Sequence, residues 1–215
     1  MKVILLALLF ALGGFPALVD DFSVSTSPGR GREIVRFRID PAKSKFMVHA
    51  DRAGLAWFKG HSHRLAVRDF SGEATLALDA VNPASLAMKV NAGSLEETDA
   101  AFTDAQKAII KKEVDELVLE SAKYPEITFR STGVTGLPRA GGYDVKISGD
   151  LTLHGATRPI TIPARVTLEG GSMRAVGEFE IDRKKFGVNA TEAFHGFVKV
   201  RHEIKFVFDI IGSRI

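Results

Sequence analysis

The sequence predicts an all-β protein in which about eight strands form an antiparallel barrel or sandwich with one inserted α-helix. Apolar and polar residues alternate with a period of two along most of the chain after Ile34, a pattern typical of half-buried strands. Glycine- and proline-containing turns separate these stretches at short intervals, which favours antiparallel neighbours. A single segment, 103–122, has helical spacing instead.

The predicted strands become more regular towards the C-terminus. The last is the longest and places Val200, His202, Ile204 and Phe206 on one face, so we expect His202 to point inward. The alternating stretches are 35–39, 74–79, 86–91, 143–153, 160–167, 174–181 and 198–210.

The helix is predicted from its start signal and its apolar spacing. Thr103 is a plausible N-cap, and Ile110, Val114 and Leu117 recur at helical intervals. We expect the helix to end before Tyr124, which precedes a proline.

The N-terminal 33 residues differ from the rest of the chain. Lys2 precedes an uncharged run, which predicts a signal peptide at 1–19 and a periplasmic or secreted protein. A retained anchor stays open, because the run is nearly long enough to span a bilayer. Residues 20–33 are polar and rich in Ser and Gly, so we expect a flexible lead-in to a domain at 34–211.

Composition and motifs exclude several function classes. The net charge is only +3 and the two signs are interspersed, which argues against nucleic-acid binding. The absence of cysteine excludes thiolate chemistry and cysteine-ligated metals. The sequence also lacks a GxSxG elbow, a phosphate-binding GxxxxGK[ST] loop and an HExxH motif.

Histidines are the main candidates for a polar site. His61 and His63 lie two residues apart in an extended segment, and His49 on the preceding strand could be a third ligand for zinc, copper or iron. The alternative is an exposed polar turn. An inward His202 would either contact a ligand's polar end or be a core residue bonded to the protein.

Four separated motifs stand out in the sequence. They are FRIDPAKSKF at 37–46 with His49, KYPEITF at 123–129, GDLTLHGATRP at 149–159, and DRKKFG at 182–187. Together they resemble the YceI-like family of secreted polyisoprenoid-binding proteins, and the similarity covers about 34–211. The family's usual Arg-Asp-x-His-Leu motif is replaced here by the predicted helix.

This resemblance implies a lipocalin-like extended barrel whose apolar interior holds a polyisoprenoid or isoprenoid quinone, as a periplasmic carrier or storage protein. It implies no catalysis and no required cofactor, and leaves open transient membrane contact and a homodimer. The competing hypotheses are a metal-binding or redox enzyme using His49, His61 and His63, and a solidly packed interaction module. The expected ligand-binding residues are Phe46, Val48, Trp57, Met88, Phe129, Leu151, Ile162, Phe179, His202, Phe206 and Phe208.

Overall fold

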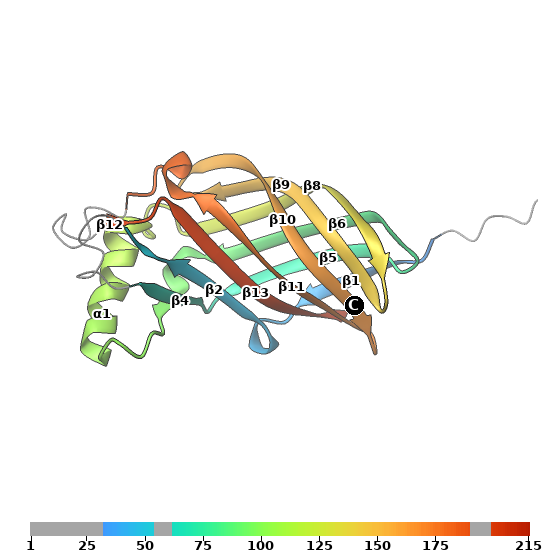
Figure 1. Ribbon diagram of the computed structural model, residues 1–215, viewed down its shortest axis with the longest axis horizontal. Coiled ribbons are helices and arrows are strands. Elements are labelled where there is room, and N and C mark those ends of the chain that lie inside the picture. Colours follow the sequence, from blue (N-terminus) through green and yellow to red (C-terminus); the bar gives the residue numbers. More distant parts are fainter. Residues whose placement is uncertain (1–31, 54–61, 190–198) are drawn as a thin grey trace, which may run out of the picture. The chain divides into compact units, whose positions relative to one another are not determined.

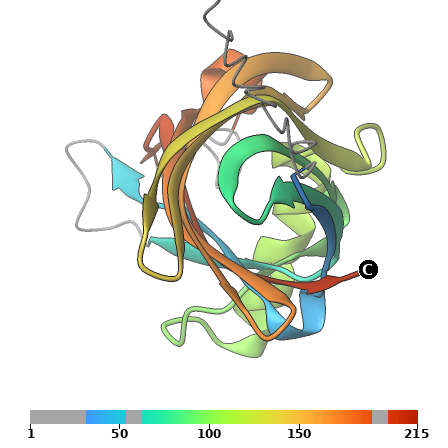
Figure 2. The same ribbon diagram turned by 90° about the vertical axis from the view of Figure 1, so that its right-hand side faces the viewer.

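The computed structural model describes residues 32–53, 62–189 and 199–215, and eight of its strands close into an antiparallel barrel (Figure 1). Each strand pairs with the next, and the last pairs back with the first (Figure 2). Because the ring of eight strands is closed, each of its strands has a paired neighbour on both sides. The strands are β1 (Ile34–Ile39), β5 (Phe70–Ala77), β6 (Ala80–Asn91), β8 (Glu126–Arg139), β9 (Gly142–Leu153), β10 (Ala156–Glu169), β11 (Ser172–Asp182) and β13 (Glu203–Arg214).

Three short strands extend the wall at one end of the barrel. They are β2 (Lys45–Ala50), β4 (His63–Val67) and β7 (Leu95–Glu97), and they follow β13 in that order. Both β1 and β2 pair with β13 on either side of the short helix η1 (Pro41–Lys43). A second sheet consists of β3 (Arg52–Ala53) and β12 (Lys199–Val200).

The predicted helix is present and lies at this same end (Figure 1). Helix α1 (Asp104–Glu113) starts with a capping box between Thr103 and Gln106, which satisfies N–H groups of its first turn. A π-helical turn, η4 (Val114–Val118), continues it. Because this wider turn changes the helical phase, Leu117 is 50% exposed, which corrects the expectation that it faces the core.

The period-two alternation becomes the wall of the barrel. Along β1, for example, Val35, Phe37 and Ile39 are buried while the residues between them are exposed. Two predicted strands differ from the observed ones. Leu78 lies beyond the end of β5 and is partly exposed, and the last predicted strand is interrupted at residues 201–202.

The buried residues form two clusters at different heights in the barrel. The cluster away from the helix includes Phe37, Val134, Val145 and Val166. The cluster toward the helix includes Ile110, Phe129 and Leu151 from facing elements. The two halves therefore have separate cores.

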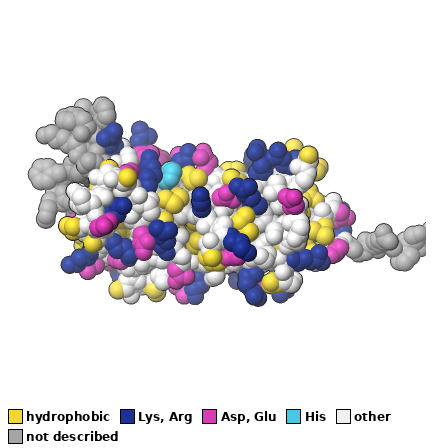
Figure 3. Space-filling model, turned by 90° about the horizontal axis from the view of Figure 1, so that it is seen from below, with side chains coloured by type: hydrophobic (Ala, Val, Ile, Leu, Met, Phe, Trp, Pro, Cys, Tyr) yellow, Lys and Arg dark blue, Asp and Glu magenta, His cyan; other side chains and the backbone are white. Residues whose placement is uncertain are grey.

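The outer surface carries both signs of charge in alternation, as Figure 3 shows for one face. Ion pairs such as Arg174–Asp209 at 2.7 Å cross neighbouring strands there. No helix among the described residues is long and apolar enough to cross a membrane.

Candidate functional site

The barrel interior holds an apolar cavity of about 220 Å³ that is lined by residues of both buried clusters. Side chains from the barrel wall surround it, and Ile110, Val114 and Val118 from the helical segment cover one end. Nine of the residues expected from the sequence to bind ligand lie in this lining. They are Phe46, Val48, Met88, Phe129, Leu151, Ile162, Phe179, Phe206 and Phe208.

Aromatic rings form one side of the cavity. Phe179 and Phe206 face each other across β11 and β13 and stack with centroids 4.9 Å apart. Phe46 on β2 lies 6.1 Å from the ring of Phe206. Such rings offer a large apolar surface with few rotatable bonds. They therefore give this side of the cavity a rigid apolar wall.

Two inward-facing glycines let rings lie flat against the wall. A Cβ built on Gly149 would come within 2.5 Å of the Phe129 ring, and one on Gly177 within 2.6 Å of the Phe208 ring. A glycine in a strand often marks such a close approach. These two positions therefore keep both rings out of the middle of the cavity.

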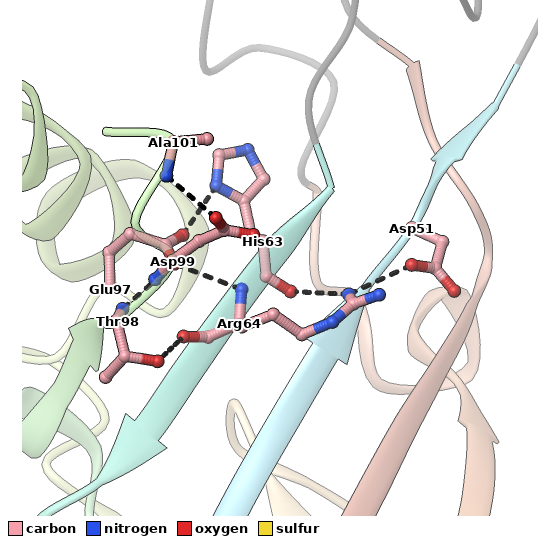
Figure 4. A network of polar contacts seen from close by, with 7 residues as sticks. All are labelled: Asp51, His63, Arg64, Glu97, Thr98, Asp99 and Ala101. Atoms are coloured by element: carbon pink, nitrogen blue, oxygen red, sulfur yellow. Dashed lines mark hydrogen bonds and ion pairs between the residues drawn. The ribbon is translucent and has the colours of Figure 1, made fainter.

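A buried network beside α1 holds one imidazole in the lining (Figure 4). His63 Nδ1 lies 2.8 Å from Glu97 Oε2, and the ring stacks on Phe102. Glu97 Oε1 accepts from the backbone N–H groups of Arg64, Thr98 and Asp99. With Glu97 as acceptor, Nδ1 carries a proton and the orientation of the ring is set.

Arg183 is the cation of the lining, and backbone carbonyls engage its guanidinium. It is 2% exposed and donates to the carbonyls of Arg201, Val188 and Val200 at 3.1, 2.8 and 3.3 Å. Burial lowers the pKa of Arg183 from its usual range. These contacts attach the turn after β11 to the segment around β12.

Sequence reasoning missed Glu97, Glu113 and Arg183 as polar groups around the cavity. Glu113 lies three residues after the buried Ile110, about one helical turn. The helical spacing could therefore have predicted that its side chain faces the interior. Arg183 belongs to the DRKKFG motif but was given no role. Glu97 lies on a strand of only three residues, too short for periodicity to reveal its burial.

Two histidines of the proposed three-histidine metal site, His49 and His63, lie on opposite faces of the sheet. Ala50 pairs with His63 and His49 pairs with Arg64, so alternation places His49 on the outer face and His63 on the inner one. Burial, together with the charge of Arg64, lowers the pKa of His49. No cluster of three metal-ligating side chains occurs among the described residues. His61 and Trp57 lie outside them.

His202 is exposed and absent from the lining, which corrects the inward orientation expected from the strand pattern. It lies in the break between β12 and β13. Its backbone carbonyl accepts a hydrogen bond from the backbone N–H of Arg183, and the backbone N–H of the neighbouring Arg201 donates to the backbone carbonyl of Asp51. These bonds turn the chain, so the alternation does not continue through residue 202.

A family model described as the YceI-like domain matches residues 37–211. The chain belongs to the YceI-like domain family. Protein YceI from a strain of Escherichia coli is 36% identical over 141 residues, which are 63% of this chain and 65% of that protein. A UPF0312 protein from Azotobacter vinelandii is 33% identical over 142 residues, covering 63% and 66%. The match thus spans slightly less than two thirds of each relative's length.

Solved structures show the same fold. BcnA from Burkholderia cenocepacia superimposes with a TM-score of 0.64 at 22% identity, over 80% of this chain and 98% of that one. A structure described as a polyisoprenoid binding domain from Saccharophagus degradans, implicated in plant cell wall breakdown, gives 0.61 at 13% identity, over 85% and 100%. The architecture is therefore the YceI-like barrel.

Two of the YceI-like motifs meet beside the helical segment. The Tyr124 ring lies 4.3 Å from the His154 ring, and a Cβ on Gly155 would come within 2.7 Å of Tyr124. His154 Nε2 also lies 2.6 Å from Glu120 Oε2. All four motifs contribute side chains to the cavity lining, namely Phe46, Phe129, Leu151 and Arg183.

Proposed function

We propose that this YceI-like protein binds a long-chain apolar ligand, of polyisoprenoid or isoprenoid quinone type, inside the barrel. The observation that carries the proposal is the cavity in the barrel interior, whose lining is predominantly apolar. An eight-stranded barrel can either fill itself with side chains or hold one small ligand. The space left inside this barrel favours the second arrangement.

The physical chemistry of the lining suits an unbranched or methyl-branched hydrocarbon chain. Each buried CH2 group contributes about 0.8 kcal/mol, and the phenylalanine and aliphatic side chains supply contact without directional bonds. The polyisoprenoid binding described for the Saccharophagus degradans domain supports the same ligand class. The nine lining residues expected from the sequence are the proposed contacts.

The role we propose is that of a carrier or storage protein of the periplasm, exported by the N-terminal signal predicted at 1–19. None of the relatives described above is named as an enzyme, and the proposed role requires no catalysis. The ligand is then the cargo, and no resident cofactor is needed.

The test is mass spectrometry of lipid extracted from full-length protein produced with its leader and isolated from the periplasmic fraction. We expect an isoprenoid-chain lipid in stoichiometric amount. A periplasmic protein of similar size, purified from the same cells, controls for lipid carried over. The absence of any enriched apolar compound would contradict the binding role, and full-length protein retained in carbonate-washed membranes would contradict cleavage of the signal and favour a retained anchor.

A further inference from the structure

One carboxylate of the cavity lining has an oxygen without a hydrogen-bond partner in the described part of the chain. Glu113, at the end of α1, belongs to the lining, and the apolar residues Ile110 and Val114 lie beside it on the same face. Its Oε2 atom is buried and has no hydrogen-bond partner among the described residues. An ionised carboxylate oxygen can only accept hydrogen bonds, so this position lacks a donor.

The other titratable side chains of the lining are already engaged. His63 is held by Glu97, and Arg183 donates to three backbone carbonyls. Asp115 also has a buried oxygen without a partner, but its other oxygen pairs with Lys111 and the residue is not part of the lining. The open acceptor of the cavity is therefore Glu113 Oε2.

We propose that Glu113 accepts a hydrogen bond from a hydroxyl group at the polar end of the bound ligand. This inference rests on the proposed function, and it narrows the ligand to an apolar chain that ends in an alcohol, phenol or hydroquinone. Leaving a buried acceptor unsatisfied is unfavourable, and a ligand hydroxyl removes that penalty.

The same geometry disfavours a phosphorylated ligand. A phosphate would place a second negative charge next to a carboxylate in an apolar environment, where like charges repel strongly. The guanidinium of the lining belongs to Arg183, and it already donates to the carbonyls of Val188, Val200 and Arg201. We therefore expect the Glu113 carboxylate to disfavour ligands with an anionic headgroup.

The experiment compares two probes that differ only in the donor. Geranylgeraniol has a hydroxyl group, and its methyl ether keeps the chain and the oxygen but cannot donate. Both are presented to delipidated full-length protein from cyclodextrin, and binding is followed by native mass spectrometry. The variants are Glu113→Leu and, as a matched control, Glu116→Leu, because Glu116 lies on the exposed side of the helical segment and faces Lys112.

We expect the wild-type protein and Glu116→Leu to bind the alcohol about tenfold or more tightly than the ether, the effect of one hydrogen bond to a charged group. Glu113→Leu should bind both probes equally. If this variant fails to fold, Glu113→Gln replaces it, and its neutral amide should reduce the preference for the alcohol, because it accepts more weakly than a carboxylate and can donate to the oxygen of either probe.

The outcomes separate the two proposals. Equal binding of both probes by the wild-type protein, or an alcohol preference that survives the loss of the Glu113 carboxylate, would overturn the role of Glu113 while leaving the apolar binding role intact. Binding of neither probe by the wild-type protein would overturn the proposed function, and the inference with it.

Discussion

At the scale of single residues, the shape of the cavity depends on glycines in the barrel wall, which have no side chain. Gly177 on β11 faces inward between two lining positions, and a Cβ there would meet the Phe208 ring at 2.6 Å and also the backbone oxygen of Pro163. A ring can rotate away, but a paired strand backbone cannot move without disturbing its neighbours. The glycine is therefore required by close approach of both groups.

Gly177→Ala should lower the free energy of unfolding by about 1–3 kcal/mol, the usual cost of overpacking, and should push Phe208 into the cavity. Gly133→Ala on β8 is the matched control, because no atom lies within 4 Å of a Cβ at that position. Denaturant unfolding of both variants checks the prediction. Equal free energies of unfolding for Gly177→Ala and Gly133→Ala would contradict the prediction, because the strands around Gly177 would then accommodate a methyl group without cost.

At the scale of elements, each long strand serves two different cores. On β10, Ile162 belongs to the cluster toward the helix and Val166 to the cluster at the other end, while Ala164 also belongs to that second cluster and borders the cavity. The period-two pattern is the same throughout. The difference arises from the size of the side chains that meet at each height of the barrel.

Ala164→Phe should occupy cavity space and reduce lipid retention, with a smaller loss of stability than Ala74→Phe. Ala74 on β5 lies in the filled cluster and does not line the cavity, so the larger ring there should cost about 1–3 kcal/mol. Lipid content and denaturant unfolding of the two variants test this. Full lipid retention by Ala164→Phe together with equal destabilisation would mean that the cavity does not hold the lipid.

At the scale of the whole molecule, the ligand is expected to act as part of the core. The barrel interior has apolar walls around open space, and a compound that binds only the folded state stabilises it by about 2.7 kcal/mol at a concentration one hundred times its Kd. Stability and cargo are therefore coupled in this fold.

Removal of the lipid should lower the melting temperature by several degrees, since about 1 kcal/mol corresponds to roughly 2–4 °C in a domain of 150–250 residues. Adding geranylgeraniol back should restore the original value. Differential scanning calorimetry of native, delipidated and reloaded protein makes the comparison. Identical melting of all three samples would contradict a ligand that completes the core.

Residue order alone was enough to predict an antiparallel all-β fold, the helix and the inward side of most strands, and the YceI-like resemblance favoured the barrel over a sandwich. Alternation follows from the geometry of an extended backbone, which turns successive side chains to opposite faces wherever the strand pairs. This is why Met88, Leu151 and Phe206 could be assigned to the interior before their neighbours were known. The YceI-like motifs added the ligand class, which periodicity does not contain.

Only the tertiary structure decided where these local patterns stop and which polar groups reach the cavity. Arg183 and Asp51 bind the backbone on either side of the break at 201–202 and expose His202, while the wide turn after Glu113 moves Leu117 outward. Both effects depend on partners distant in sequence or on a change of helical phase. The open space has the same origin, because a cavity is the difference between the volume a closed wall encloses and the volume its side chains fill.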